Sequence, residues 1–357
     1  MARKIKYKPK YNQPGLFDLA GDTGDVDTAS PAPLPADDET PTAAGSEFDV
    51  RSVAPAKEAA APSDPIELDA SAIGRRDDIV FMSFGSGSSG NCSYIGDSEG
   101  GFLIDAGIDP DKLRDDLRAN GLSFDNIKGV CLTHDHSDHV RFVYTLVRKH
   151  PHIGVYCTPR TLSGIMRRHS ISRRLKDYHR PIYKEFAFKI GNFEITAFEV
   201  SHDGTDNSGF FITHGAHTFA VATDLGCITD RVEYYMSQAR YIMLESNYDA
   251  AMLREGAYPM HLKARIAADN GHLDNAVAGE FLGRMLSPRL SHIFLCHLSK
   301  DNNTPETALA TVTAALHAAG ATSIGDCSGS LEARKCDVQL MALPRFDASP
   351  LICLRLT

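Results

Sequence analysis

Residues 133–139 read Thr-His-Asp-His-Ser-Asp-His, and the fold and chemistry that we predict both start from this stretch. Four of these side chains, His134, His136, Asp138 and His139, lie within six positions. Neutral imidazole and carboxylate are the usual protein ligands of zinc, manganese and iron. Packing readily explains one histidine, but four such polar side chains together would be costly to bury without a partner. The cluster therefore predicts a metal site.

The residues before this cluster read Lys-Gly-Val-Cys-Leu, from 128 to 132, and predict a short buried strand. Such a strand would place the cluster on a loop at the edge of a sheet. Side chains at nearby positions on such a loop can converge on one point.

The spacing His-x-His-x-Asp-His on such a loop resembles the signature of the metallo-β-lactamase fold hydrolases. That pattern continues with a histidine, an aspartate and a histidine, each placed just after a strand. The chain has them in this order, at His202, Asp224 and His297. Each of these three is a weak signal alone, but the ordered set is a strong match.

The resemblance implies a centre with two divalent metal ions, which the residue types leave open as zinc, manganese or iron. It assigns the first ion to His134, His136 and His202. It assigns the second to Asp138, His139 and His297, with Asp224 bridging the two.

The fold class follows in part from the residues. Apolar runs and alternation predict strands that are interspersed with helices, so the pattern indicates an α/β domain. We expect strands at 78–84, 92–95, 102–105, 182–190, 193–200, 210–212, 218–223, 241–245 and 292–296. We expect helices at 109–120, 140–150, 275–286 and 305–319. The resemblance, rather than the periodicity, implies a four-layer αββα sandwich.

A glycine-rich stretch, Gly-Ser-Gly-Ser-Ser-Gly-Asn at 85–91, fits the spacing of a dinucleotide-binding loop. That fingerprint must open a helix, whereas a strand, a turn and a second strand are predicted here. We therefore expect a tight loop at the metal-bearing edge. This loop resembles the opening of one subgroup of the family, the YycJ/WalJ-type exonucleases. The subgroup resemblance extends over most of 78–305 and includes Leu-Glu-Ser-Asn at 244–247 and Gly-His-Leu-Asp-Asn at 271–275.

The resemblance implies a cytoplasmic 5′→3′ DNA exonuclease that acts in DNA repair. Two metal ions can hold the attacking and leaving oxygens of a phosphodiester, and a hydroxide bridging them is a nucleophile at neutral pH. Asp138 would bind metal and orient the hydroxide. His272, before a predicted helix, would contact the phosphate or protonate the leaving oxygen, although a packing role is an equal alternative. A ribonuclease of the same fold, a small-ester or thioester hydrolase, and a non-catalytic repair scaffold remain open.

A basic stretch follows the cluster. Residues 148–189 contain 11 Lys and Arg against two acidic residues, in a chain whose formal net charge is −9. We expect its densest part to follow a phosphate backbone, with double-stranded DNA favoured because few aromatic residues are present for stacking bases. A solubilising surface is the simpler alternative. The residues concerned are Arg167, Arg168, Arg173, Arg174, Lys176 and Arg180.

Composition separates the ends of the chain from its centre. The first 78 residues carry 9 Lys and Arg against 15 Asp and Glu and have few large apolar residues, so we expect a disordered tail over 1–77 and one catalytic domain over 78–357. Within the tail, Gln13, Leu16 and Phe17 resemble the peptide with which bacterial repair proteins bind the sliding clamp.

Eight cysteines without a Cys-x-x-Cys pair fit a reducing cytoplasm, and no apolar run is long enough for a membrane span. The last 35 residues have no predicted role.

Overall fold

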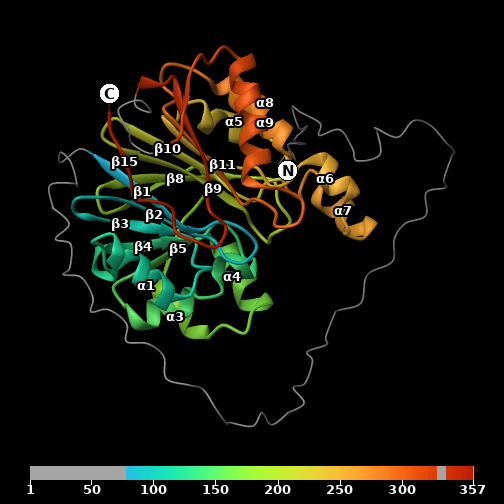
Figure 1. Cartoon of the computed structure of the whole chain (residues 1–357). Helices are drawn as coiled ribbons and strands as arrows, with labels where there is room; N and C mark the ends of the chain where they lie inside the picture. Colours follow the sequence, from blue (N-terminus) through green and yellow to red (C-terminus); the bar gives the residue numbers. More distant parts are fainter. Residues whose placement is uncertain (1–77, 328–334, 357) are drawn as a thin grey trace, which may run out of the picture. The chain divides into compact units, whose positions relative to one another are not determined.

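The computed structural model describes residues 78–327 and 335–356. The predicted tail, with Gln13, Leu16 and Phe17, lies outside these ranges. In the described part, the strands form two mixed sheets. The first sheet has the order β15-β1-β2-β3-β4-β5-β6, and the second has the order β13-β14-β12-β11-β10-β9-β8-β7. Figure 1 shows the two sheets face to face.

The strands of the first sheet are β1 (Ile79–Gly85), β2 (Cys92–Asp97), β3 (Gly100–Ile104), β4 (Ile127–Cys131), β5 (Gly154–Cys157), β6 (His179–Pro181) and β15 (Ile352–Leu354). Those of the second sheet are β7 (Ala187–Ile190), β8 (Phe193–Glu199), β9 (Ser208–His214), β10 (His217–Ala222), β11 (Tyr241–Glu245), β12 (His292–Cys296), β13 (Ile324–Gly325) and β14 (Val338–Ala342).

Alternation along the strands separates the core between the sheets from the cores under the helices. In β1, Phe81 points between the sheets, where its ring lies 5.3 Å from that of Phe219 and 4.5 Å from that of Phe294. Its neighbours Val80 and Met82 belong to the core on the opposite face. Successive side chains of a strand point to opposite faces, so every central strand contributes to two cores.

Helices cover the outer face of each sheet (Figure 1). The first sheet packs against α1 (Pro110–Ala119), α3 (Val143–Lys149) and α4 (Pro159–Arg168) through residues such as Leu113, Leu146 and Leu162. The second packs against α5 (Asp230–Met236), α8 (Asn275–Met285) and α9 (Pro305–Ala318) through residues such as Val232, Phe281 and Val312. The order helix, sheet, sheet, helix confirms the predicted αββα sandwich.

Two predicted elements differ from the structure in their bounds. The helix expected over 140–150 is present as α3, which begins at Val143. A separate short helix, α2 (Ser137–Val140), precedes it, so Asp138 and His139 lie in a helical turn rather than on an open loop. The strand expected over 182–190 is present only as β7 (Ala187–Ile190); residues 182–186 cross between the sheets, because β6 belongs to the first and β7 to the second. Tyr183 and Phe186, which made this segment look like a strand, are exposed.

The C-terminal residues join both sheets. The strand β14 extends the second sheet beside β12, and β15 pairs with β1 in the first. Between them, the amide of Ser349 donates to the carbonyl of Ser83, and the amide of Ser83 donates to the hydroxyl of Ser349. Across the described ranges, no helix is both long and apolar enough to cross a membrane.

Candidate metal centre

The predicted ligands follow strands that end at one edge of the sandwich. His134 and His136 come after β4, His202 after β8, and Asp224 after β10. His297 follows β12, which runs parallel to β10 through β11. Because side chains after such strands meet at one edge, residues far apart in the sequence come together here.

The structure brings the predicted ligands into overlapping groups with donor atoms within 4.8 Å of one another. One group is His134, His136 and His202; another is Asp138, His139 and His297. These are the two sets that the resemblance assigned to separate ions.

Asp224 lies between the two sets. Its Oδ2 is 3.3 Å from Nε2 of His139, and its Oδ1 is 3.3 Å from Nδ1 of His297 and 3.8 Å from Nε2 of His202. A bridging carboxylate needs this central position, so the geometry is compatible with the predicted role.

Most of the histidines are fixed through their Nδ1 atoms. His139 donates to Asp105 at 2.7 Å, His202 to the carbonyl of Gly271 at 2.8 Å, and His297 to Glu245 at 2.8 Å. Nδ1 of His134 lies 3.0 Å from the hydroxyl of Thr133. A ring held at Nδ1 presents Nε2, and this is how proteins orient histidine ligands.

Two of the Nε2 atoms have no hydrogen-bond partner among the described residues. These atoms, in His134 and His297, are buried. A buried polar atom left unpaired costs free energy unless another partner satisfies it. Imidazole and carboxylate donors around these two atoms fit divalent metal ions.

Burial and nearby charges shift the titration of the cluster in opposite directions. Burial holds the pKa of His134 well below its ordinary value. Burial would also lower the pKa of His297, but Asp224, Asp138 and Glu245 raise it to about 10. Burial would raise the pKa of Asp138, yet His139 and His297 hold it well below its usual range. Without metal, the proton on His297 balances the charge of the nearby carboxylates, whereas His134 is neutral.

The backbone is strained at three of these positions. Asp105, Asp224 and His297 have φ values of 62°, 53° and 54°, which is unfavourable for residues other than glycine. Strain of this kind persists where surrounding contacts impose it, often at functional sites. Here it lets the chain turn sharply after a strand and direct the side chain inward.

Glu245 is a site residue that the sequence reasoning did not single out. It ends β11, is buried, and accepts hydrogen bonds from Nδ1 of His272 at 2.7 Å and of His297 at 2.8 Å. Its other oxygen accepts from the amides of Leu225 and Leu273. One carboxylate thus joins a predicted ligand to His272 and to the loop after Asp224. The quoted string Leu-Glu-Ser-Asn was the only signal for it.

Asp105 and Asn91 were also missed. Asp105 follows β3 and accepts from both His139 and Thr133. Asn91, at the end of the glycine-rich loop, places its side-chain nitrogen 3.1 Å from Oδ2 of Asp138 and 3.0 Å from Nε2 of His139. The loop therefore lies at the edge that bears the cluster, as predicted.

His272 lies three residues before α8, whose N-cap is Asp274, in the position that we predicted. Burial would lower the pKa of His272, but Glu245 raises it above the ordinary value. A cleft of about 250 Å³ is lined by His272 together with His136, Asp138, Asp224 and His297. The cleft gives a substrate access to the cluster.

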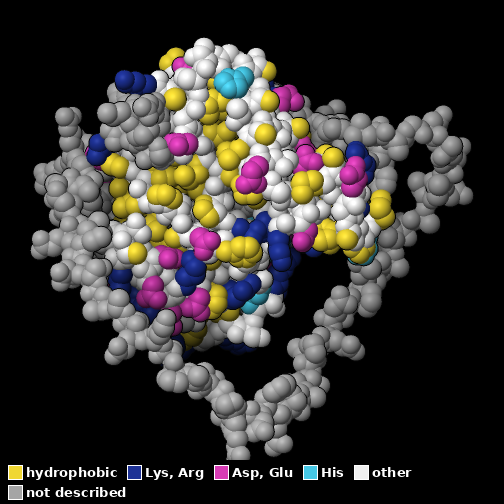
Figure 2. All heavy atoms as spheres, viewed as in Figure 1, with side chains coloured by type: hydrophobic (Ala, Val, Ile, Leu, Met, Phe, Trp, Pro, Cys, Tyr) yellow, Lys and Arg dark blue, Asp and Glu magenta, His cyan; other side chains and the backbone are white. Residues whose placement is uncertain are grey.

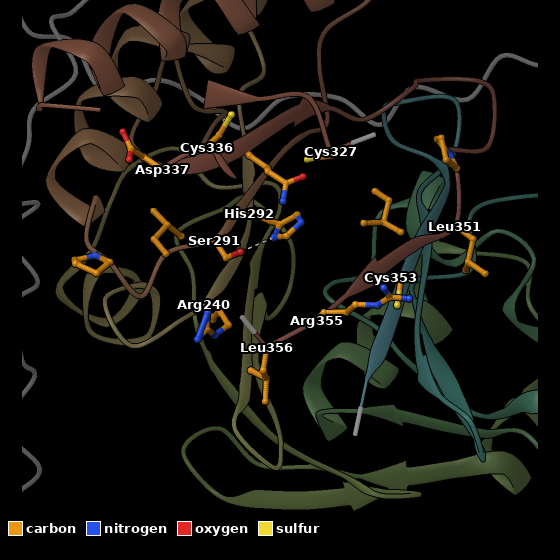
Figure 3. A pocket seen from close by; sticks show the side chains of 15 residues that line it. Arg240, Ser291, His292, Cys327, Cys336, Asp337, Leu351, Cys353, Arg355 and Leu356 are labelled. Carbon is orange, nitrogen blue, oxygen red and sulfur yellow. Dashed lines mark hydrogen bonds between the residues drawn. The ribbon is translucent and has the colours of Figure 1, made fainter. Parts of the chain in front are cut away.

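A second cavity, of about 520 Å³, lies at the opposite edge of the second sheet. His292, at the start of β12, lines it with Arg240, Cys336 and Cys353 (Figure 3). The candidate metal-ligand groups found in the described part of the chain do not include these residues. The cleft, rather than this cavity, is therefore the candidate active site.

The basic residues of 167–180 are exposed, but they do not share one helix face. Arg167 and Arg168 end α4, whereas the others belong to a short 3₁₀ helix, η3 (Arg173–Tyr178), and to β6. Nη1 of Arg168 lies 3.5 Å from Oδ1 of Asp135, between the ligands His134 and His136. In Figure 2, Lys and Arg side chains gather near the middle of the face shown, around the place of α4 in Figure 1.

Comparison with known proteins agrees with the family resemblance seen in the sequence. A family model described as the β-lactamase superfamily domain matches residues 101–293. Exodeoxyribonuclease YycJ of Bacillus anthracis is 32% identical over 248 residues, which cover 68% of this chain and 90% of that protein. Exodeoxyribonuclease WalJ of Streptococcus pneumoniae is 33% identical over 224 residues, covering 62% and 82%.

Solved structures with this fold are more distant in sequence. The metallo-β-lactamase fold protein YhfI from Bacillus subtilis is 14% identical, with a TM-score of 0.55 over 76% of this chain and 99% of that one. Zinc-bound PqqB from Methylobacterium extorquens is 16% identical, with a TM-score of 0.53 over 78% and 100%. At these identities the structures support the fold alone.

Proposed function

The chain belongs to the β-lactamase superfamily and is a metal-dependent hydrolase, and from this premise we propose that it is a 5′→3′ DNA exonuclease that acts in DNA repair. The curated relatives named exodeoxyribonuclease support the substrate class, since one of them is matched over 90% of its length. The polarity and the role in repair come from the family resemblance.

One observation carries the proposal: six imidazole and carboxylate side chains are grouped around Asp224 beside an open cleft, and two of the buried Nε2 atoms have no hydrogen-bond partner among the described residues. We propose that His134, His136 and His202 hold one ion and that Asp138, His139 and His297 hold another, with Asp224 between them. Two such ions would polarise a phosphodiester and supply hydroxide at neutral pH.

The protein's own side chains then position the substrate. Glu245 holds Nδ1 of His272, so Nε2 is the nitrogen that acts toward the cleft. Glu245 raises the pKa of His272, which favours the protonated imidazole that a proton donor needs. We propose that it contacts the scissile phosphate and donates a proton to the leaving oxygen. Asp138, at the cleft wall, orients the attacking water.

The basic residues Arg167, Arg168, Arg173, Arg174, Lys176 and Arg180 are proposed to bind the phosphate backbone. Their exposure and the contact of Arg168 with Asp135 support this, because they extend from the metal cluster across the surface. Contacts with the phosphate backbone carry no sequence information. We therefore propose that the protein binds duplex DNA through its backbone rather than by reading its bases.

An activity panel tests the function. Protein loaded with manganese or zinc should hydrolyse end-labelled duplex DNA, and Asp138→Asn should not. Faster cleavage of structured RNA would favour the ribonuclease alternative. Hydrolysis of a thioester alone would sink the nuclease proposal, and DNA binding without turnover in either metal would favour a scaffold.

The tail proposal is tested separately. We propose that residues 1–25 bind the bacterial sliding clamp through Gln13, Leu16 and Phe17, with an affinity on the order of micromolar. Replacing Leu16 and Phe17 by alanine should leave activity on free DNA unchanged and reduce it only with loaded clamp. A wild-type peptide that fails to bind would contradict the proposal.

A further inference from the structure

One wall of the cleft is made by α7 (Met260–Ile266), which follows α6 (Ala250–Glu255). In Figure 1 these two short helices lie to one side of the sandwich. Leu262, Arg265 and Ile266 of α7 line the cleft, together with Tyr258 before the helix. From this wall we infer that Arg265 binds a phosphate group of the nucleic acid, and this inference rests on the proposed function.

The sequence of α7 explains which side chains reach the cleft. Positions three and four apart lie on the same face of a helix, so Leu262, Arg265 and Ile266 form one face. Lys263 lies on another face, where it is buried and its Nζ donates to the carbonyl of Arg254 at 2.6 Å. This bond ties α7 to α6 and fixes which face meets the cleft.

Arg265 is held beside the candidate metal ligands. Its Nε and Nη2 donate to Oδ2 of Asp203 at 2.8 and 2.7 Å. The other oxygen of Asp203 is 3.2 Å from Nε2 of His136 and 3.5 Å from Nε2 of His202. Asp203 therefore contacts both Arg265 and two histidines of the cluster, and so holds the guanidinium beside them.

The remaining donors of Arg265 suit a phosphate. A guanidinium has five N–H groups in a planar fork, and Asp203 engages only one edge of it. The side chain is 65% exposed, and exposed ion pairs contribute little to stability. Among the residues that line the cleft, Arg265 alone carries a permanent positive charge. A held but accessible cation next to apolar Leu262 and Ile266 matches a nucleotide, which has a charged phosphate and apolar ring faces.

The test compares wild type with Arg265→Gln, Arg265→Lys and Arg254→Gln, all loaded with manganese. Arg254 is the matched control, because it is an exposed arginine on α6 whose side chain does not line the cleft. Calorimetry with inorganic phosphate and with deoxyadenosine 5′-monophosphate measures binding without turnover. We expect Arg265→Gln to bind the nucleotide about 10- to 100-fold more weakly, the loss typical of a charged hydrogen bond. Arg265→Lys should recover only part of it.

Metal content and kinetics decide the interpretation. Arg265→Gln should keep its manganese and have a higher KM on duplex DNA than wild type. Arg254→Gln should match wild type in both respects. If Arg265→Gln impairs the hydrolysis of bis(p-nitrophenyl) phosphate as much as that of duplex DNA, the phosphate that Arg265 binds is the scissile one. If the effect needs a 5′-phosphate on the duplex, the phosphate is terminal. The inference would be overturned if Arg265→Gln lost manganese in proportion to its loss of nucleotide affinity, or if its nucleotide affinity were unchanged. A wild type that binds nucleotide but cleaves no phosphodiester would refute the proposed function alone.

Discussion

At the scale of residues, the centre depends on the groups behind the histidines. Asp105, Glu245 and the carbonyl of Gly271 each accept the Nδ1 proton of a different ring. Each acceptor selects the tautomer in which Nε2 can bind metal. A change behind a ligand should therefore alter the centre without removing a ligand.

Glu245→Gln tests this relation. One oxygen of Glu245 accepts from Nδ1 of both His272 and His297, and the other accepts from two backbone amides. A glutamine has only one acceptor oxygen, so its NH₂ group must face one of these two pairs of N–H donors. We expect kcat or metal affinity to fall about 10- to 100-fold, the usual effect of losing such a partner. Titration of the apo protein with zinc and a pH–rate profile measure the two effects.

Glu280→Gln is the matched control, since Glu280 lies on the surface of α8 and pairs with Arg284. It should behave as wild type. Unchanged activity and metal affinity in Glu245→Gln would show that the rings are held by other contacts.

Proton release gives a second prediction at this scale. Without metal, the pKa of His297 is about 10, so its imidazole is protonated at neutral pH. Metal binds only the neutral ring, so binding must release this proton. The apparent affinity should therefore rise with pH through the neutral range and level off near pH 10. Calorimetry in two buffers with different ionisation enthalpies counts the protons. No release at pH 7 would contradict the assignment of His297.

At the scale of elements, the sequence predicted strands better than the segments between them. The run at 292–296 is apolar after His292 and is a buried strand in the structure. The helix expected over 140–150 begins only at Val143, because the chain turns after α2, where the amide of Phe142 donates to the carbonyl of Ala106. The crossing at 182–186 depends on Glu185, whose φ is 68°. Neither the hydrogen bond of Phe142 nor the backbone conformation of Glu185 has a local sequence signal.

The basic residues are tested as a surface spanning α4 and η3. Arg167, Arg173 and Arg174 are changed to glutamate, whereas Arg168 is kept because it contacts buried Asp135. DNA binding should weaken for every sequence, and its salt dependence should decrease by roughly one unit of slope per lost phosphate contact. Filter binding over a range of salt concentrations measures this.

Hydrolysis of bis(p-nitrophenyl) phosphate serves as the control, since this substrate is too short to reach η3. Its rate should stay near that of wild type. Equal losses on DNA and on the small substrate would mean that the changes damage the centre, and the surface would then have no demonstrated role in binding.

At the scale of the whole molecule, the centre joins the two sheets. His134, His136, Asp138 and His139 follow a strand of the first sheet, whereas His202, Asp224 and His297 follow strands of the second. The order of these residues along the chain was visible in the sequence. The contacts of Glu245, and that of Arg265 with Asp203, were not, because they join residues 20 to 62 positions apart.

This arrangement predicts that metal stabilises the fold. An ion that binds only the folded protein adds about 4 kcal/mol at a thousandfold excess over its Kd. For a domain of this size, about 2–4 °C of Tm corresponds to each kcal/mol, so chelation should lower Tm by on the order of 10 °C. Melting curves with and without EDTA measure the shift.

Two variants give this experiment its controls. Asp224→Asn weakens the group that lies between both ligand sets, so its Tm should respond much less to EDTA than that of wild type. His261→Ala removes an exposed histidine of α7 and should retain the full shift. If EDTA abolishes activity but leaves the Tm of wild type unchanged, the metal does not join the sheets. In that case the carboxylate and imidazole contacts alone hold this edge of the sandwich, and the strained backbone at Asp224 and His297 is maintained without the ion.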